Sequence, residues 1–566
     1  MAYELKKGEI DNRDLDQAVV KSSGPWYKRL KEIKGLLLAL VSMAQTLDII
    51  NMASVTIVLP DIMEDVGYKL DQLQWVMSAY ALAYGAFLLV GGRFGDLFGH
   101  RRIFMMGVFW FSIWALVNGF AKNPVIMSVG RALQGLGAGF TVPSALAILT
   151  TTYPVGPERT HALAIFGSTA ACGSIVGVLF GGIFGSTIGW RWIFFITAIL
   201  GFSLGTLAFF VIPEEKGEGK VEDRRVDYLG VGCFTLGIVA VIYYLSEGPA
   251  KGWKAGSTLG PLIAGLVLLV AFFVVEWRID YPIMPLHIWK SRRLISSCLI
   301  IACISASVNT LIFFSSLTFQ SVLGYSPIHT SVCYIVQGVG SIITMVALTR
   351  LVTMVRTKFL TLVGWLFFIA SGIVFAQIKE TSSYASIPLP ALILNFLGMA
   401  PVWLCAQINS VADADDEDQG VVGAVFNTCL QIGAPIGIAI SNIIANNTNA
   451  PTAIGAQLLP GYRAAFYTQA IIGGVGFVIT IVYHPNRDPA KLSEGITAEE
   501  VAVVAAAGGD ENLSTHHRNN NAAQKDIETA PSSEIFEMKS AGLASADATT
   551  IFQGPSATLG GTEELR

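Results

Sequence analysis

Long apolar segments alternate with short polar or glycine- and proline-bearing turns along most of the chain. About 20 mostly apolar residues are enough for a helix to cross the hydrocarbon core of a bilayer. Fourteen segments reach this length, and they predict fourteen transmembrane helices. The expected spans are 35–60, 73–94, 102–121, 125–152, 161–185, 191–212, 227–246, 258–279, 294–316, 328–350, 357–377, 387–407, 421–444 and 464–484. The fold class that follows is an all-α polytopic membrane protein.

Composition narrows the class of protein further. Hydrophobic residues make up 53% of the 566 residues and charged residues only 14%, whereas about 25% of the residues in soluble domains are charged. A soluble fold would leave too much of this apolar surface in contact with water. The formal net charge of -4 provides no basic field for nucleic acid. We therefore expect a lipid bilayer around the chain and no nucleic-acid partner.

Positive charge is unevenly divided between the two sides of the expected spans. Short cytoplasmic loops carry an excess of Lys and Arg, and this bias sets the orientation of membrane proteins. The richer side holds Arg101, Arg102, Arg159, Lys216, Lys220, Arg224, Arg225, Lys290, Arg292, Arg293, Arg356 and Lys358. This side is therefore expected to be cytoplasmic, and an even number of spans puts both termini there.

Ionisable residues deep within a span are costly and usually functional. Asp48 lies about 20 Å along the first expected span at 1.5 Å per residue, which is near the middle of the bilayer. Gln45 and Asn51 stand three residues to either side of it and share its helix face. We interpret this face as the lining of a water-filled cavity, with Asp48 as a proton-coupling carboxylate. The alternative is a carboxylate that only hydrogen-bonds a neighbouring helix.

Arg131 and Gln134 form a second polar pair on one face of the fourth expected span. A buried arginine can serve a proton pathway or a substrate cavity. It can also be a structural brace between two helices, and the sequence leaves both interpretations open.

The turn expected between the second and third spans, residues 92–102, reads Gly-Arg-Phe-Gly-Asp-Leu-Phe-Gly-His-Arg-Arg. Its glycines permit a tight turn with close backbone approach. The segment resembles the signature of the major facilitator superfamily, Gly-x-Leu-Ala-Asp-Arg-x-Gly-Arg-Arg. The matching positions are Gly92, Gly95, Asp96, Gly99, Arg101 and Arg102. The resemblance implies a cytoplasmic gate formed by Gly92, Asp96, Gly99, Arg101 and Arg102. Leu97 departs from the signature, because the family usually has a basic residue there.

Two further segments extend the resemblance. Residues 130–139 in the fourth span are similar to the second motif of the family. Gly173, Gly177, Gly181 and Gly185 recur every four residues in the fifth span and form a ridge for close helix packing. The antiporter motif of the family, Gly-x-x-x-Gly-Pro-x-x-Gly-Gly, is matched at Gly173, Gly177, Gly181 and Gly182. Val178 stands where that motif has proline.

Other segments are similar to the fourteen-span drug:proton antiporter family, and most similar to its fungal branch of aminotriazole and boron resistance pumps. They are Leu47–Asp48, Pro60 at the end of the first span, and Trp190–Phe195. In the C-terminal half, Asn427 and Gln431 lie one turn apart on one face of the thirteenth span, and we expect them in the substrate cavity. Spans nine to fourteen have no charged residue at depth, so the first half has to supply the coupling carboxylate.

The resemblance implies two six-helix bundles, residues 35–212 and 294–486, with two extra helices inserted in the linker 213–293. Residues 1–34 then form a cytoplasmic N-terminal segment. Residues 487–566 are rich in Ser, Thr, Asn, Ala and charge, which is typical of a disordered cytoplasmic tail.

The resemblance implies a secondary active transporter that exports a drug, toxic compound or metabolite in exchange for protons, by alternating access. An importer or uniporter of a small polar solute on the same fold is the first alternative, and Val178 keeps it open. A non-transporting membrane sensor is the second alternative. The chain after residue 487 has too little apolar content for the folded cytoplasmic domain that such a sensor usually carries.

An acidic run, residues 413–418, contradicts the positive charge expected on the cytoplasmic side. We expect Arg101 or Arg102 to pair with one of its acidic residues when the cytoplasmic side is closed. The candidate partners are Asp415, Asp416, Glu417 and Asp418. A plain solvated loop is the alternative interpretation.

The remaining motifs set limits on chemistry. We find no nucleotide-binding loop, nucleophile elbow or Cys/His metal spacing, so we expect no enzyme activity, cofactor or metal site. The seven cysteines fall within expected spans and are interpreted as buried hydrophobes. Asn446 begins a glycosylation sequence close to a helix end, where we expect it to stay unmodified. The expected partners are a small-molecule substrate, protons and lipid, for a monomer in the plasma membrane or, alternatively, a vacuolar membrane.

Overall fold

The computed structural model describes residues 25–70, 72–153, 157–213, 227–279, 284, 286–414, 419–450 and 453–485. All of them belong to one compact unit, Met1–Ala507, whereas a second unit, Gly508–Arg566, lies outside the described residues. The expected tail 487–566 and most of the N-terminal segment 1–34 also fall outside this range. Their predicted disorder and location therefore stay predictions.

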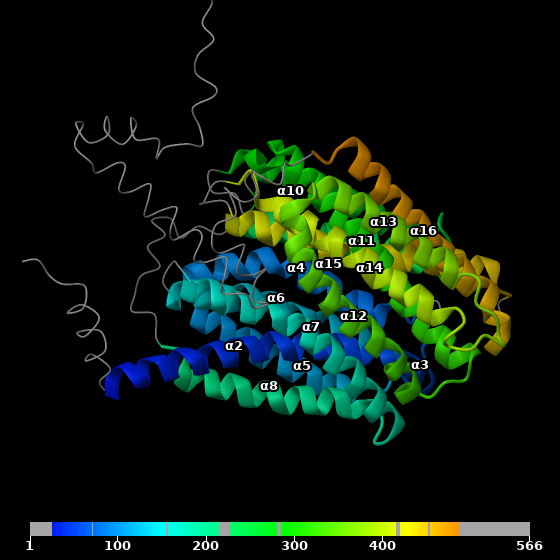
Figure 1. Cartoon of the computed structure of the whole chain (residues 1–566), viewed down its shortest axis with the longest axis horizontal. Helices are drawn as coiled ribbons and strands as arrows, with labels where there is room; N and C mark the ends of the chain where they lie inside the picture. Colours follow the sequence, from blue (N-terminus) through cyan, green and yellow to red (C-terminus); the bar gives the residue numbers. More distant parts are fainter. Residues whose placement is uncertain are drawn as a thin grey trace, which may run out of the picture. The chain divides into compact units, whose positions relative to one another are not determined.

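The described residues form helices and contain no strand (Figure 1). The long and short α-helices are α2 (Pro25–Ile57), α3 (Leu59–Val66), α4 (Trp75–Phe98), α5 (His100–Gly119), α6 (Pro124–Thr152), α7 (Pro157–Ser186), α8 (Arg191–Val211), α9 (Tyr228–Lys251), α10 (Gly256–Arg278), α11 (Arg292–Leu317), α12 (Pro327–Met354), α13 (Thr357–Phe375), α14 (Pro388–Val411), α15 (Gln419–Thr448) and α16 (Leu459–Val482). Three short elements lie between them: η1 (Leu286–Lys290), η2 (Thr318–Val322) and η3 (Gly455–Leu458).

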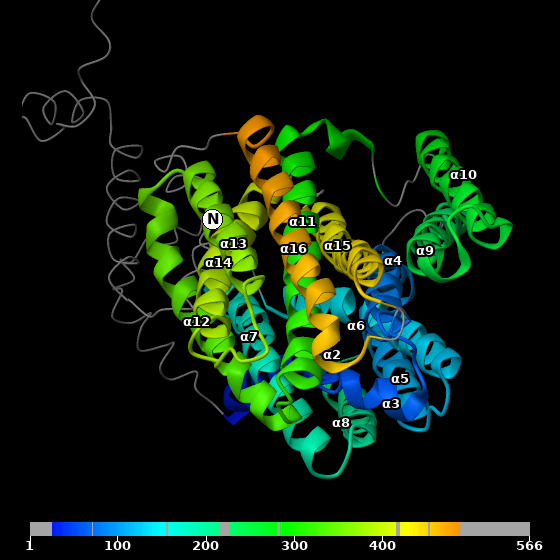
Figure 2. The ribbon, with the colours of Figure 1, turned by 90° about the vertical axis from the view of Figure 1, so that its right-hand side faces the viewer.

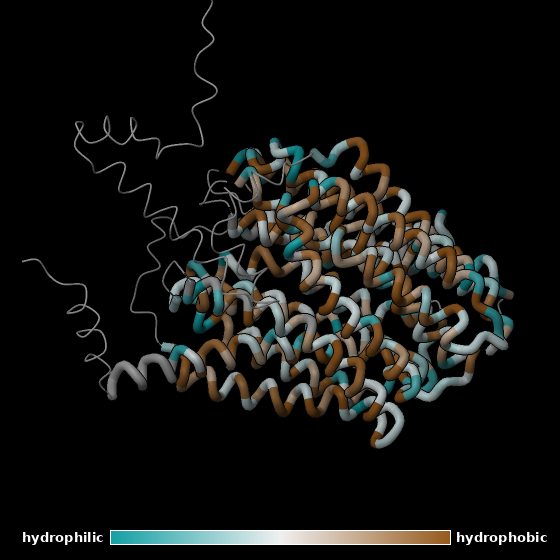
Figure 3. Tube along the Cα trace, in the orientation of Figure 1, coloured by the Kyte–Doolittle hydropathy of each residue, from teal (hydrophilic) through white to brown (hydrophobic). Residues whose placement is uncertain are grey.

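Thirteen described helices are long and apolar enough to cross a membrane. The remaining expected span, 227–246, corresponds to α9, in which the apolar stretch Leu229–Val241 is shorter than the others. Hydrophobic residues follow the lengths of the helices, and hydrophilic residues gather mostly near their ends (Figure 3). The all-α polytopic fold class is confirmed.

The first expected span is wrong at its end. Residues 35–60 were expected to form one helix ended by Pro60, but α2 stops at Ile57 and a separate helix, α3, begins at Leu59. Pro60 lies in the first turn of α3. Backbone N–H groups there have no partner within the helix, so a proline, which lacks the N–H, is tolerated. Pro60 therefore starts a short helix instead of ending a long one.

The helices pack as two bundles, with α9 and α10 at one side of them. In the N-terminal bundle, α6 packs on α4 and α5, α2 packs on α7 and α8, and α5 packs on α8. In the C-terminal bundle, α11 packs on α14, α15 and α16, and α13 and α12 each pack on α14. The inserted helices α9 and α10 pack on each other, and α9 also contacts α4 and α15 (Figure 2).

The two bundles meet at the ends of α2, α7, α11 and α12 that lie near α3, which we call the α3 end. Ser316 and Gln320 donate hydrogen bonds to the carbonyl oxygens of Thr56 and Ile57, at 3.0 and 2.7 Å. One buried hydrophobic cluster at this end includes residues of both bundles, such as Val55 and Phe319. The α3 end is therefore held together across the two bundles. We call the opposite end, at the junction of α4 and α5, the Gly99 end.

Trp190 and Arg191, which sequence analysis singled out, hold α3 in place at the start of α8. The Arg191 guanidinium and the Trp190 indole N–H both hydrogen-bond the Asp65 carboxylate of α3, the latter at 2.9 Å. The Arg191 hydrogen bond lowers the pKa of Asp65 from its usual value. This contact attaches α3 to the N-terminal bundle.

Candidate functional site

Asp48 lies in α2, and its side chain is 6% exposed. The Tyr80 hydroxyl of α4 donates a hydrogen bond to its Oδ1 atom. A buried carboxylate needs such a donor, because an unpartnered charge inside a membrane protein is strongly unfavourable. Tyr80 therefore supplies the polar contact that the position of Asp48 demands.

Arg131 is fully buried between α2, α4 and α6. Its Nε donates to the Val76 carbonyl oxygen at 2.9 Å, and its Nη1 donates to Asn51 Oδ1 at 2.7 Å and Gln134 Oε1 at 2.9 Å. Its Nη2 atom has no hydrogen-bond partner among the described residues. The arginine thus links α2, α4 and α6, and its Nη2 atom makes no hydrogen bond to the described residues.

Tyr80 joins the carboxylate to the guanidinium. Its hydroxyl contacts Asp48, and the centre of its ring lies 4.3 Å from Arg131 Cζ, within the range of a cation–π contact. Asp48 and Arg131 therefore interact through the tyrosine. Tyr80 was not predicted as a site residue from the sequence, because a tyrosine in an apolar span belongs to no motif that indicates a function.

Asn51 and Gln134 extend the network on the far side of Arg131. Asn51 donates to Thr197 Oγ1 of α8 at 3.3 Å, and Asn118 of α5 donates to Gln134 Oε1 at 3.0 Å. Gln45, which was expected beside Asp48, is partly buried, and its Oε1 atom has no partner among the described residues. The structure thus brings together Asp48, Asn51, Arg131 and Gln134 and leaves Gln45 outside their hydrogen bonds.

A small cavity borders Asp48, and its walls come from helices other than Tyr80's helix α4. It has a volume of about 10 Å³ and is enclosed by α2, α5, α6 and α8, with Leu47, Phe111 and Thr141 among its walls. About 10–15 Å³ is the least space that holds a water molecule. The cavity is therefore at the lower limit for one water molecule and is far too small for an organic solute.

Asn427 and Gln431 of α15 do not join this network. Asn427 is exposed and donates to the Gly423 carbonyl oxygen of its own helix at 2.9 Å. Gln431 packs against α4, where a Cβ atom added to Gly85 would lie 2.8 Å from Gln431 Cβ. Both residues thus lie on α15, and Gln431 belongs to the contact between the two bundles.

The expected turn at residues 92–102 is wrong over most of its length. Residues up to Phe98 continue α4 as a helix, and Gly99 alone, with φ of 92°, separates it from α5. This φ favours glycine. Gly95 allows close approach of His100, whose Nδ1 would lie 2.3 Å from an added Cβ atom, whereas Gly92 has only Pro143 nearby, at 3.8 Å.

The charged residues of this segment have contacts within the N-terminal bundle. Asp96 is exposed and lies 3.4 Å from His100 Nε2. Arg101 donates to the Phe209 carbonyl oxygen of α8 at 2.6 Å, and its guanidinium lies 5.4 Å from the Phe209 ring centre. Arg102 is exposed. The proposed pairing with Asp415, Asp416, Glu417 or Asp418 lies outside the described residues.

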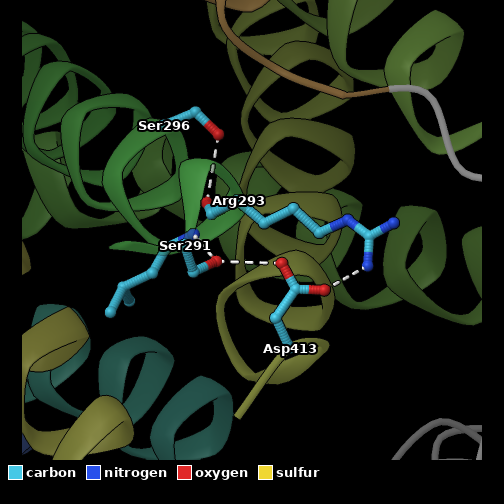
Figure 4. A network of polar contacts seen from close by, with 5 residues as sticks. Ser291, Arg293, Ser296 and Asp413 are labelled. Carbon is cyan, nitrogen blue, oxygen red and sulfur yellow. Dashed lines mark hydrogen bonds and ion pairs between the residues drawn. The ribbon is translucent and has the colours of Figure 1, made fainter. Parts of the chain in front are cut away.

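Asp413, which begins the acidic run, has partners in its own bundle (Figure 4). Ser291 donates to Asp413 Oδ2 at 2.9 Å, and Arg293 forms an ion pair with Oδ1, which ties the start of α11 to the end of α14. The run is therefore partly neutralised by Arg293, and this arginine lies on the side predicted to be rich in positive charge.

His484, just after α16, adds a buried contact at the same end of the C-terminal bundle. Its Nδ1 lies 3.1 Å from Ser296 Oγ, and its Nε2 lies 2.9 Å from Asn409 Nδ2. Burial, together with the positive charges of Lys358 and Arg293, lowers the pKa of His484 to about 4. The imidazole is therefore neutral at physiological pH and pins α16 to α11 and α14.

The glycine ridge of α7 packs directly on α2. Added Cβ atoms would lie 3.2 Å from the Thr46 carbonyl oxygen at Gly173, 2.7 Å from that of Ile50 at Gly177 and 2.6 Å from that of Ser54 at Gly181. Gly182 faces the other bundle, where Ser331 Oγ of α12 would lie 2.1 Å from an added Cβ atom. The ridge thus touches α2, and its neighbour Gly182 touches α12.

The other expected features are placed as follows. Asn446 lies in the last turn of α15, and the expectation that it stays unmodified remains a prediction. The seven cysteines are free thiols, but the expectation that all are buried is wrong, because only Cys298, Cys333 and Cys405 are buried and Cys172 is exposed. Within the described residues, no group of three or more His, Cys, Asp or Glu side chains is arranged to hold a metal ion.

Comparison with known proteins identifies the family. Residues 41–438 match the Major Facilitator Superfamily. The chain belongs to this superfamily. It is a membrane transporter and not an enzyme, and its substrate is a small molecule.

Similar proteins come from fungi and bacteria. A multidrug transporter of the superfamily from Aspergillus fumigatus, mfsC, is 30% identical over 81% of this chain and 88% of its own length. The puromycin resistance protein pur8 of Streptomyces alboniger is 32% identical over 73% of this chain and 82% of its own. The low affinity ammonium transporter of Saccharomyces cerevisiae is 28% identical, covering 73% and 81%.

Among solved structures, the fold is similar to that of the POT family transporter PepTSo. The TM-score is 0.59 at 14% identity, over 79% of this chain and 97% of that one. At this identity the likeness concerns the fold alone. This similarity agrees with an arrangement of two helical bundles, the first of which contains Asp48, Tyr80 and Arg131.

Proposed function

We propose that this transporter exports small organic molecules in exchange for protons, and that Asp48 is the carboxylate that carries the proton. The direction is supported by the relatives named as a multidrug transporter and as a puromycin resistance protein. Membership of the superfamily supports alternating access, in which two bundles rock around a central site.

The observation that carries the proton assignment is the environment of Asp48. The carboxylate is buried, accepts a hydrogen bond from Tyr80 and borders a cavity of about 10 Å³. An organic substrate does not fit this cavity. Asp48 is therefore better suited to carry a proton than to contact the exported molecule.

In this mechanism, protonation changes how α2, α4 and α6 are joined. The charged carboxylate is a strong acceptor for the Tyr80 hydroxyl, and the protonated acid is a weaker one. The Tyr80 ring also contacts Arg131, which is bound to α2 and α6 residues, so a weaker Asp48–Tyr80 contact loosens one link between three helices. We propose that this loosening biases the equilibrium between the two access states.

The remaining assignments complete the proposal. The Gly99 end and both termini are cytoplasmic, the α3 end faces outside, and the protein is a monomer in the plasma membrane. The bundles comprise residues 35–212 and 294–486, with 213–293 between them. The excess of Lys and Arg near the Gly99 end supports this orientation.

Import of a small polar solute is the second candidate function. It is favoured by the relative named as a low affinity ammonium transporter and by Val178, which replaces the proline of the antiporter motif. This candidate uses the same fold and differs in the direction of net transport.

Transport in whole cells tests the proposal. Cells with and without the protein are loaded with a panel of labelled compounds, and efflux is measured at two external pH values. Export predicts faster efflux of at least one compound in cells with the protein, and faster still at the lower external pH. Faster uptake with no efflux of any compound would instead establish the importer.

A further inference from the structure

Two amide side chains inside the C-terminal bundle have unused hydrogen-bonding atoms. Gln337 of α12 donates from Nε2 to Asn395 Oδ1 of α14 at 3.2 Å. Asn395 is fully buried and Gln337 is 9% exposed. Within the described part of the chain, Gln337 Oε1 and Asn395 Nδ2 have no partner.

The chemistry of the unused atoms does not depend on how the two amides are oriented. An amide oxygen and nitrogen are exchanged by a half-turn of the group. If both groups turn, Asn395 donates to Gln337, and the atoms left over are again one carbonyl oxygen and one NH₂ group. In either arrangement the pair offers one unused acceptor and one unused donor.

A buried amide pair with unused polar atoms is unfavourable in a membrane. The bilayer core supplies no water to satisfy a polar atom, so buried amides there normally find partners in the protein. A polar network that is only half satisfied is less favourable than an apolar contact. The pair is therefore better explained by a ligand that completes it than by a structural role.

The pair lies beside the contact between the two bundles. An added Cβ atom at Gly338 would lie 2.4 Å from Ile175 of α7. Ser331, six residues before Gln337 and so about 9 Å along α12, donates to the Val178 carbonyl oxygen at 2.7 Å. Gln337 therefore lies on the segment of α12 that contacts α7.

We propose that Gln337 and Asn395 form a substrate subsite that binds a primary amide or a lactam. Such a group presents an N–H donor and a carbonyl acceptor next to each other, which complements the acceptor and donor of the pair. The proposal rests on the transport function, because it assigns part of the site for the transported molecule. It is separate from the proton step at Asp48.

The test measures binding to the purified full-length protein. The probes are benzamide, nicotinamide and 2-pyrrolidone, each paired with its N-methylated form (N,N-dimethyl for the first two), which lacks the donor. The midpoint of thermal unfolding is measured against probe concentration to obtain an apparent Kd. A single lost hydrogen bond at a built site weakens binding by about tenfold.

Wild-type protein is expected to bind at least one amide about tenfold more tightly than its methylated form. The double variant Gln337→Met/Asn395→Leu should lose this preference and stay as stable as wild type without ligand, because it removes both unfinished amides together. The control Gln377→Met removes an exposed amide at the end of α13 and should keep the preference.

Two results overturn the inference. One is the absence of any amide preference in wild type, with water alone completing the pair. The other is a double variant that unfolds at markedly lower temperature, which would assign the pair a structural role. Failure of proton-driven export in vesicles would refute the proposed function and leave a measured amide preference intact.

Discussion

Tyr80 donates its hydroxyl hydrogen bond to the Asp48 carboxylate, and so connects α4 to α2 near the centre of the N-terminal bundle. The face of the same ring lies 4.3 Å from the Arg131 guanidinium carbon. The Tyr80 side chain therefore contacts both the negative and the positive group of the site. We expect a change in the charge of Asp48 to affect Arg131 through Tyr80.

Tyr80→Phe tests this connection. The substitution keeps the ring against Arg131 and removes the donor to Asp48. A hydrogen bond to a charged group contributes about 1.5–3 kcal/mol, so we expect the rate of proton-driven transport to fall about tenfold or more, with normal expression. Tyr467→Phe, which removes the hydroxyl that accepts from Gln377 at the surface, is the control. A wild-type rate in Tyr80→Phe would remove Tyr80 from the mechanism.

Gly177→Leu tests the ridge on α7. Even a Cβ atom there would lie 2.7 Å from the Ile50 carbonyl oxygen, so a larger side chain forces α2 and α7 apart. Overpacking of this kind costs about 1–3 kcal/mol, and we expect transport to stop while much of the protein still inserts. Gly167→Ala, on the same helix with open space around it, should transport normally. Normal turnover in Gly177→Leu would show that the close contact is not needed.

Gly182→Ala tests the contact between the bundles at the α3 end. The added Cβ atom would lie 2.1 Å from Ser331 Oγ and 2.9 Å from Ile328 Cα of α12. We expect the equilibrium to shift about tenfold toward separation of α7 and α12, from an overpacking cost of about 1–3 kcal/mol.

Distances between spin labels at the exposed residues Ile188 and Ile454 measure this shift, in a background without native cysteines. The distribution in Gly182→Ala should gain a longer component, and that of Gly167→Ala should match wild type. Identical distributions in all three proteins would contradict the role of this contact.

His484 predicts a pH dependence of stability. Its pKa is lowered from 6.5 to about 4 in the folded protein, so the unfolded chain takes up a proton at a pH where the folded chain does not. Stability is therefore full above about pH 6.5 and declines as the pH falls toward 4, by about 3 kcal/mol at most. The midpoint of thermal unfolding in detergent should decline over this interval.

The variant His484→Gln isolates this group. It should flatten the decline of the midpoint between pH 6.5 and 4, whereas His161→Gln, at an exposed position on α7, should follow the wild-type curve. An unaltered slope in His484→Gln would mean that the decline has another origin.

The fold class could be predicted from the sequence, because the length of each apolar span matches the thickness of the hydrocarbon core of a bilayer. Helix boundaries were less predictable. Pro60 can end a helix or begin one, and the glycines of residues 92–98 can bend a chain or allow neighbours to approach a helix. Only the packing of His100 and the break at Gly99 distinguish these possibilities.

The site was predicted in part for a related reason. Asp48, Asn51, Arg131 and Gln134 are polar residues where the membrane disfavours them, so the sequence reveals them. Tyr80 belongs to the same network but has the amphipathic character common at many positions in spans, and its role depends on which two helices it lies between. Gln337 and Asn395 are far apart in sequence, and only the packing of α12 on α14 brings them together.

The central claim is that Asp48 carries the transported proton, and Asp48→Asn in proteoliposomes tests it most directly. Substrate flux is measured with an imposed pH gradient and without one, beside Glu276→Gln, which alters another buried carboxylate, on α10. The account predicts that the gradient accelerates flux in wild type and in Glu276→Gln and has no effect in Asp48→Asn. Undiminished gradient-driven flux in Asp48→Asn would contradict it.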